Sequence, residues 1–209
     1  EIPYHLDTTR RTPAEVVERV LALVQAAPVC WDVVTPTGKY PVLLLPGGLA
    51  YLGDALRARG IASQVAVVSD EQVWPLYGQQ VLDSLEASGH QATVITLPAG
   101  EQYKTLDTVR LIYDRLIAGR IDRSSALVAV GGGVITDMAG FAAATYMRGV
   151  PFVPVPTTLL GMVDASVGGK VAVDHPQGKN LIGAFLQPLL VLVDTRTLET
   201  LPAAEHRSG

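Results

Sequence analysis

The sequence is poor in cysteine, with one, Cys30, among 209 residues. A single cysteine excludes a disulfide bond within the chain and is typical of the reducing cytoplasm. A lone cysteine can serve as a nucleophile, but Cys30 stands beside Trp31, and we expect its thiol to be packed. The sequence therefore predicts a cytoplasmic protein that is held together by its hydrophobic core.

Histidine and long apolar runs are also scarce. The four histidines are widely spaced, with no pair at i, i+4, so they indicate no metal site. Of these, His175 is expected to be a turn residue, with a substrate role left open. No segment approaches the roughly 20 apolar residues of a membrane-spanning helix. The net charge of −4 argues against a general nucleic-acid binder. We therefore expect neither nucleic acid nor a membrane as a partner.

The N-terminal segment predicts a helix. Residues 12–15, Thr-Pro-Ala-Glu, form a capping box with proline at the first helical position. Valine and leucine then follow at helical spacing up to Val24. The next segment, residues 26–41, is rich in proline and holds a short predicted strand, so we place a domain boundary near Ala27.

Beyond this boundary, apolar strands alternate with helical stretches. Strands are predicted at residues 31–35, 41–45, 64–68, 93–97, 126–130, 152–155 and 189–193. The alternation predicts an α/β fold with a Rossmann-like, mostly parallel sheet that helices cover on both faces. Sheets of this kind bind ligands beyond the carboxyl ends of their strands.

Three glycines, residues 131–133, follow the strand in ALVAVGGGVITDMAG, residues 126–140. They match neither common nucleotide loop, because Thr136 stands where G-x-G-x-x-G needs glycine and no Gly-Lys-Ser/Thr sequence is present. A tight turn with positive φ would need one glycine, whereas three let the backbone approach an anion at the start of a helix. The sequence therefore predicts an anion-binding turn.

Charged side chains near the strand ends each have two interpretations. Asp137, expected in the first turn of the helix after the glycines, either complements the helix dipole or binds sugar hydroxyls. Asp70, directly after a strand, either holds a ribose or caps a helix. Glu101 and Lys104 either form an i, i+3 surface pair or belong to the site. The residues alone leave these alternatives open.

The segment RGVPFVPVPTTLLGMVDASVGGKVAVDHPQGKNLIGAF, residues 148–185, embeds polar side chains among valine, leucine and phenylalanine. These side chains are Arg148, Asp164, Lys170, Lys179 and Asn180. A solvated surface would scatter such charges, and packing of lysine stems at a surface would account for one of them. Cations among glycine turns suit a substrate that carries phosphate and carboxylate groups.

The stretch from GGGVITDMAGF to GKNLIGAF resembles the core signature of the 3-dehydroquinate synthase family, with PAGEQYK and LETLP in the same register. The resemblance runs from about Val33 to the end of the chain. It implies an enzyme of the shikimate pathway that uses NAD and a divalent metal, zinc or cobalt. Such an enzyme converts 3-deoxy-D-arabino-heptulosonate 7-phosphate into 3-dehydroquinate and phosphate, and it is expected to be a homodimer.

The resemblance also implies roles for particular residues. Asp164, Lys170 and Asn180 would hold the substrate, and Arg148 would reach its phosphate from the partner subunit of a dimer. The implied NAD contacts are Asp70, Glu101, Lys104, Gly132, Gly133, Val134, Asp137, Thr157, Thr158, Lys170, Lys179, Thr197, Leu198 and Thr200. Within that set, Asp70, Glu101 and Lys104 would contact the adenosine part, and the glycines the pyrophosphate.

Both ends of the chain depart from the family's pattern. The resemblance implies that the zinc ligands, a glutamate and two histidines, follow in a helical C-terminal metal-binding domain, which we expect to be missing from these 209 residues. We therefore expect residues 27–209 to bind NAD, to hold no metal and to be inactive alone. Residues 1–26 resemble the last strand and helix of shikimate kinase, which implies an internal piece of a fused kinase–synthase polypeptide.

Three other functions remain open at this point. A sister sugar-phosphate cyclase, such as a 2-deoxy-scyllo-inosose synthase, would differ only in some substrate contacts. A metal-dependent polyol dehydrogenase would share the glycine-rich strand end but not VDASVGGK and GKN. The third alternative is a non-catalytic nucleotide-binding module.

Overall fold

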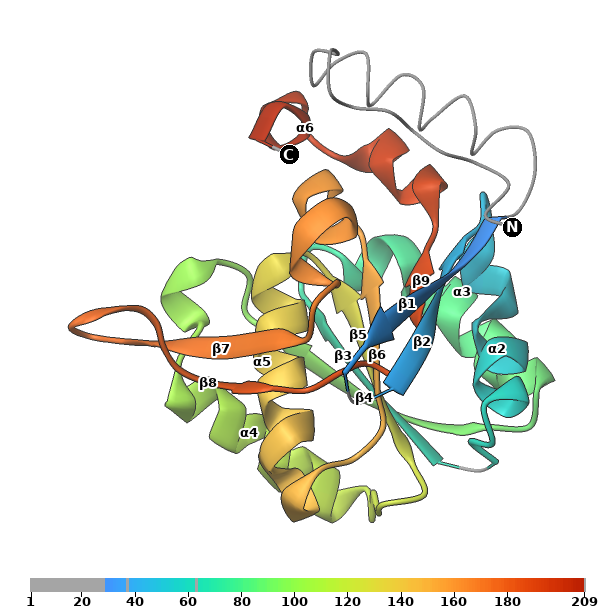
Figure 1. The fold of residues 1–209 in the computed structure, drawn as a ribbon, viewed down its shortest axis with the longest axis horizontal. Coiled ribbons are helices and arrows are strands. Elements are labelled where there is room, and N and C mark those ends of the chain that lie inside the picture. The colour runs from blue at the N-terminus through green and yellow to red at the C-terminus, as the bar shows by residue number, and fades with distance from the viewer. Residues whose placement is uncertain (1–28, 37, 63, 209) are drawn as a thin grey trace.

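The computed structural model describes residues 29–208, apart from residues 37 and 63 (Figure 1). The helix expected after residue 12 and the kinase-like segment, residues 1–26, lie outside the described residues. Their assignment stays a prediction.

Four parallel strands form the central sheet, in the order β4-β3-β5-β6 (Figure 1). Their bounds are β3 (Gln64–Asp70), β4 (Gln91–Leu97), β5 (Ala126–Gly131) and β6 (Phe152–Pro156). Strands β5 and β6 are buried along their whole length, as expected for runs of valine, leucine and alanine with a covering layer on each face. The predicted strands are thus confirmed, with ends that differ by a few residues.

A second sheet of three strands lies beside the first. It has the order β1-β2-β9, with bounds β1 (Val29–Thr35), β2 (Gly38–Leu44) and β9 (Val191–Val193). Strands β1 and β2 are antiparallel, whereas β2 and β9 are parallel. The expected single sheet is therefore divided between β6 and β9.

Prolines in β6 explain this division. The N–H of Thr157 donates to Gly131 of β5, so the alternate positions Phe152, Pro154 and Pro156 face β9. The carbonyl of Phe152 accepts one bond, from Leu189 N–H, at 2.8 Å. The two prolines have no N–H to donate, so the ladder goes no further.

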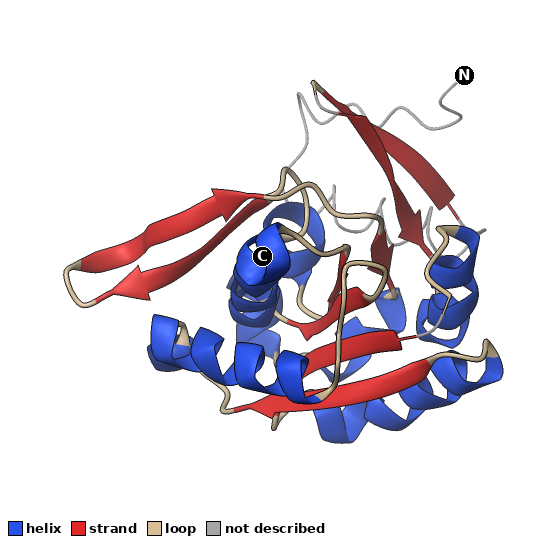
Figure 2. Cartoon of the chain, turned by 90° about the horizontal axis from the view of Figure 1, so that it is seen from below, coloured by secondary structure: helices blue, strands red, loops and turns tan. Residues whose placement is uncertain are grey.

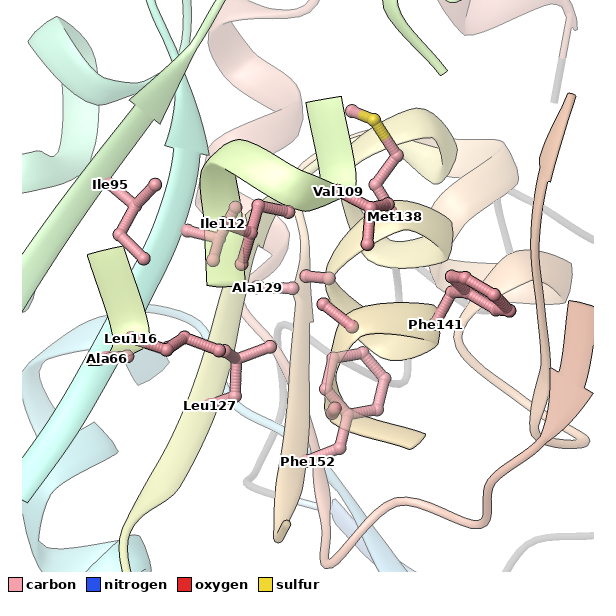
Figure 3. Packing of buried hydrophobic residues seen from close by; sticks show 14 of the residues in the cluster. Ala66, Ile95, Val109, Ile112, Leu116, Leu127, Ala129, Met138, Phe141 and Phe152 are labelled. Atoms are coloured by element: carbon pink, nitrogen blue, oxygen red, sulfur yellow. The ribbon is translucent and has the colours of Figure 1, made fainter. Parts of the chain in front are cut away.

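Helices cover both faces of the central sheet, as the sequence predicts. Their bounds are α2 (Leu52–Ala58), α3 (Trp74–Ala87), α4 (Leu106–Ala118) and α5 (Gly133–Thr145). The short α6 (Ala203–Ser208) contributes no residue to the cores on either face. Alternate residues of β3 face opposite sides: Ala66 and Val68 pack against α4 and α5, and Val65 and Val67 against α2 and α3. Figure 3 shows the first of these cores, with Ile112 of α4 and Met138 of α5 over Ala129 of β5.

An antiparallel hairpin, β7 (Lys170–His175) and β8 (Gly178–Phe185), was not expected from the sequence. It lies across α5 and extends from the body of the molecule (Figure 2). A Cβ on Gly140 of α5 would lie 2.3 Å from Cγ1 of Val171, so the absence of a side chain there lets the hairpin approach the helix. The sequence assigns Lys170, the first residue of β7, and Lys179 and Asn180, the second and third residues of β8, to the site.

The thiol of Cys30 is exposed, so the expectation that it is packed is wrong. Cys30 lies on β1, the outer strand of its sheet, where alternate side chains point away from the core.

None of the described helices is both long enough and apolar enough to cross a bilayer.

Candidate functional site

A cavity of about 620 Å³ opens at the carboxyl ends of β3, β4, β5 and β6. A second cavity, of about 420 Å³, shares Asp137, Asp164, Ala165 and Asn180 with the first and reaches Lys170. We call them the large and the small cavity. The strand ends that the sequence singles out therefore converge on one edge of the sheet, as parallel topology requires.

Most of the residues predicted for the site line these cavities. The large cavity is lined by Asp70, Glu101, Lys104, Gly132, Gly133, Val134, Asp137, Thr157, Thr158, Asp164, Asn180, Thr197 and Thr200. Lys170 lines the small cavity. Three predicted residues, Arg148, Lys179 and Leu198, line neither cavity.

The glycine turn between β5 and α5 is shaped by close packing. Gly132 has φ −75°, so the alternative of a turn that needs positive φ is wrong. A Cβ would lie 2.8 Å from Ile135 Cβ at Gly131 and 3.0 Å from Thr158 Cγ2 at Gly132. At Gly133, the same Cβ would make an ordinary contact of 3.5 Å. The turn therefore lies against its own helix and Thr158, as close backbone approach requires.

The start of α5 lies at the wall of the large cavity. Its first backbone bond runs from Thr136 N–H to the carbonyl of Gly132, so the N–H groups of residues 133–135 precede the regular ladder. Gly133, Val134 and Ile135 all line the large cavity. A helix N-terminus in this position favours an anion, through its free donors and its dipole.

Lys104 is buried, with 4% of its surface exposed, so the surface-pair interpretation is wrong. Its ammonium donates to Asp137 Oδ2 at 2.5 Å and to Asn180 Oδ1 at 2.6 Å. Asp137 is the fifth residue of α5 and lies beyond its first turn, which corrects the dipole interpretation. Burial raises the pKa of Asp137, and the hydrogen bond from Lys104 opposes that rise.

The tip of the hairpin is tied to the segment that holds Lys104. The ammonium of Lys179 donates to Glu101 Oε1 at 3.0 Å, and this bond raises the pKa of Lys179. Asp174 Oδ1 accepts from Asn180 N–H at 2.7 Å, and Asp174 N–H donates to the carbonyl of Lys104 at 2.8 Å. Side chains far apart in sequence are thereby fixed beside both cavities.

Asp70 is the last residue of β3, and its carboxylate closes a turn. Oδ1 accepts from the N–H groups of Gln72 and Val73 at 2.9 Å each, before α3 begins at Trp74. The side chain also lines the large cavity. Asp70 thus closes the turn before α3 but does not cap the helix, whose N-cap is Val73 without a side-chain bond, and a ribose contact is compatible with this position.

Arg148 and Leu198, two of the three predicted residues that line neither cavity, differ in their surroundings. Arg148 is exposed at the far end of α5, and 13 residues at about 1.5 Å each place it about 20 Å from the glycine turn. Leu198 is buried, with 7% exposed. His175 is exposed and is the last residue of β7, directly before the turn at residues 176–177, and its Nδ1 accepts from Gln177 N–H at 3.2 Å.

Sequence reasoning missed Tyr77, which lines the large cavity from α3. Its hydroxyl donates to the carbonyl of Thr197 at 3.0 Å and also contacts Thr200 Oγ1. It thereby fixes η5 (Thr195–Thr200) against α3. A tyrosine within an amphipathic helix carries no local signal for such a role, because its partners lie over 100 residues away.

Across the described part of the chain, no group of three or more histidine, cysteine, aspartate or glutamate side chains is arranged to hold a metal ion. The described residues therefore do not fit the zinc or cobalt ion that the resemblance implies for the longer enzyme.

A family model described as 3-dehydroquinate synthase N-terminal matches residues 94–208, which is more than half of the chain. The chain belongs to the 3-dehydroquinate synthase family. It is 56% identical over 171 residues to the 3-dehydroquinate synthase of Pelobacter propionicus, covering 82% of this chain and 48% of that protein. The chain thus spans about half the length of the curated relatives it matches.

Two solved synthase structures resemble the fold. One is 2-deoxy-scyllo-inosose synthase with carbaglucose-6-phosphate, NAD⁺ and Co²⁺, at a TM-score of 0.79 and 29% identity, over 85% of this chain and 48% of that one. The other is 2-epi-5-epi-valiolone synthase from Streptomyces hygroscopicus subsp. jinggangensis 5008 with NAD⁺ and Zn²⁺. It matches at a TM-score of 0.74 and 34% identity, over 84% of this chain and 48% of that one.

Proposed function

We propose that this chain is the NAD-binding half of a 3-dehydroquinate synthase, a carbon–oxygen lyase. The enzyme would convert 3-deoxy-D-arabino-heptulosonate 7-phosphate into 3-dehydroquinate and phosphate. One observation carries the proposal: an anion-binding helix start and a cluster of lysine, carboxylate and amide side chains share one pair of joined cavities. The 56% identity to a 3-dehydroquinate synthase supports this substrate over others.

The large cavity fits a dinucleotide. The N-terminus of α5 would receive the pyrophosphate, and a side chain on Gly132 would press on Thr158 and disturb this wall. Asp70 and the η5 threonines Thr197 and Thr200 would contact the adenosine part. NAD supplies an acceptor for a hydride from a substrate alcohol and returns that hydride later in the cycle.

The small cavity fits a hydroxylated acid. Lys170 offers a cation to a carboxylate, while Asp137 and Asp164 offer acceptors to hydroxyl groups. Holding the substrate by both kinds of contact would orient it against the cofactor cavity, because Asp137 and Asp164 line both. We assign no step to a metal ion, since the described residues supply no ligand set for one.

Arg148 would bind the substrate phosphate from the second subunit of a homodimer. Its position about 20 Å from the glycine turn, at the opposite end of α5, keeps it from its own cavities. Its exposure leaves the guanidinium free to meet a phosphate on a neighbouring subunit.

A sister cyclase is the second candidate, because 2-deoxy-scyllo-inosose synthase shares the fold at a TM-score of 0.79. The carbaglucose-6-phosphate in that structure is the carbocyclic analogue of glucose 6-phosphate. Glucose 6-phosphate, unlike 3-deoxy-D-arabino-heptulosonate 7-phosphate, has no carboxylate. The two candidates therefore differ in the group that would meet Lys170.

Reconstitution tests the proposal. The chain would be mixed with the separately produced C-terminal half of the Pelobacter propionicus relative, Zn²⁺, NAD and either substrate, and phosphate release would be followed. We expect release with the heptulosonate, and a loss of about 100-fold or more in kcat/KM for Lys170→Met, which removes a charge-assisted contact. Lys39→Met is the matched control, because Lys39 is exposed and pairs with Asp32 on the β1–β2 hairpin.

The outcomes separate the candidates. Turnover of glucose 6-phosphate alone would favour the sister cyclase. Calorimetric binding of NAD without any phosphate release would leave a non-catalytic nucleotide-binding module. Full activity in Lys170→Met would contradict the assignment of the small cavity to the substrate.

A further inference from the structure

Lys104 lies at the boundary between the two cavities. Its ammonium bonds Asp137 Oδ2 and Asn180 Oδ1, and both of those residues line the large and the small cavity. Lys104 itself lines only the large cavity and is 4% exposed. A cation buried to this degree is rare unless it is paired, and here one of its two partners is an uncharged amide.

The chemistry of the ammonium fixes the orientation of that amide. An ammonium group has three donors and no acceptor, so the atom of Asn180 that faces Lys104 must be the oxygen. The amide nitrogen, with two N–H donors, then lies on the side away from Lys104. Asn180 is exposed, and among the described residues no side chain or carbonyl accepts from this nitrogen.

The backbone of Asn180 also has a hydrogen-bond partner. Its φ of 56° is in the left-handed region, which asparagine tolerates better than most residues. Its N–H donates to Asp174 Oδ1 at 2.7 Å, and the N–H of Asp174 donates to the carbonyl of Lys104 at 2.8 Å. Lys104 thus anchors Asn180 through both its side chain and, by way of Asp174, its backbone.

We infer that Lys104 is a positioning residue that turns the Asn180 amide so that its N–H₂ group faces the substrate. The N–H₂ group and the ammonium of Lys170 both donate, so together they select a ligand that accepts hydrogen bonds, and a carboxylate can accept from both. The role differs from the adenosine contact that the family resemblance implies for Lys104. The identity of the carboxylate substrate rests on the proposed function, whereas the Lys104–Asn180 contact does not.

A stability cycle on the chain tests the contact without any ligand. The variants are Lys104→Met, Asn180→Gly and the double variant, and glycine is chosen because it accepts the positive φ without strain. Each substitution should lower the melting temperature. We expect the decrease in the double variant to be smaller, by a few degrees, than the sum of the decreases in the two single variants. Strictly additive losses would show that the two side chains do not interact and would overturn the inference.

The reconstituted enzyme at saturating NAD tests the positioning role. Lys104→Met and Asn180→Gly should each raise the KM for the heptulosonate phosphate by about 10- to 100-fold, and the double variant should raise it no further. An analogue with a hydroxymethyl group in place of the carboxylate should be insensitive to both substitutions. Lys39→Met is again the matched control and should leave KM unchanged.

Two results would contradict the inference in different ways. If Lys104→Met raises KM by the same factor in the Asn180→Gly background, Lys104 acts directly on the substrate. If it weakens NAD binding and leaves the substrate KM unchanged, Lys104 is a cofactor contact. An inactive wild-type reconstitution would refute the proposed function instead, and the stability cycle would then decide whether Lys104 positions Asn180.

Discussion

Individual side chains at this site act through partners that are remote in sequence. Lys104 and Asn180 are 76 residues apart, and Lys104 and Asp137 are 33 apart, yet all three meet within hydrogen-bond distance. The carboxyl of Asp137 experiences two opposing effects, because burial disfavours its charge while the ammonium of Lys104 favours it. Burial prevails, so the pKa of Asp137 is raised.

This raised pKa gives stability a definite dependence on pH. The folded chain holds the Asp137 proton more tightly than the unfolded chain, so its stabilising contribution is full below the ordinary value of 3.8. The contribution is lost as the pH rises through the folded pKa. Asparagine does not ionise, so Asp137→Asn serves as the reference. The melting temperature of the wild type minus that of Asp137→Asn should fall as the pH rises from roughly 3.5 to 7, and differential scanning fluorimetry measures both.

The matched control for this experiment is Asp32→Asn, which removes an exposed carboxylate from the β1–β2 hairpin. A difference between wild type and Asp137→Asn that stays constant or grows with pH would contradict the raised pKa.

Among the elements, two short helices depend on one buried carboxylate, and one of them, η5, lines the large cavity. Asp194, with 2% of its surface exposed, follows β9 and caps η5 through Arg196 N–H at 3.1 Å. The same carboxylate accepts from Gly47 N–H at 2.8 Å and from Leu49 N–H at 3.1 Å, at the start of η1 (Gly48–Tyr51). One side chain therefore fixes both elements, including the segment that carries Thr197.

Replacing this carboxylate should loosen both elements together. In Asp194→Asn, one acceptor oxygen becomes an N–H₂ group that faces a backbone donor, and we expect a loss of about 2–3 kcal/mol in the free energy of unfolding. Urea denaturation measures the loss. Asp83→Asn is the control, since Asp83 is exposed and accepts from Gln79 one turn earlier. Equal stability of the two variants would show that the caps do not matter.

For the whole molecule, the sheet and the hairpin together create a cavity rich in negative charge. Five carboxylates line the large cavity, from Asp70, Glu101, Asp137, Asp164 and Glu205. The N-terminus of α5 and Lys104 are the features that offset this charge for an anionic ligand. A ligand with an additional phosphate near Asp70 would meet repulsion.

NAD should therefore stabilise the chain more than NADP does. At 100 times its Kd, NAD should raise the free energy of unfolding by about 2.7 kcal/mol. For a chain of this size, that corresponds to a rise of roughly 5–10 °C in melting temperature. Differential scanning fluorimetry with both dinucleotides at equal concentration measures the effect. Equal shifts for NAD and NADP would refute the assignment of the adenosine ribose to the part of the large cavity near Asp70.

Local patterns in the sequence determined a large share of this protein. The alternation of valine-rich runs with amphipathic stretches fixes the strands and helices, because burial on both faces demands apolar residues. Parallel topology then brings the ends of the strands to one edge, so the position of the site also follows. The glycines at 131–133 mark that edge without any knowledge of the fold.

Tertiary structure alone decided which side chains meet there. The β7–β8 hairpin was missed, and its approach to α5 depends on Gly140 facing Val171, a packing contact that no local pattern records. The bond between Lys104 and Asn180 forms because that hairpin lies over the segment after β4. A sequence pattern encodes periodicity along one chain segment, whereas hydrogen bonds depend on distances between segments, which only the folded chain sets.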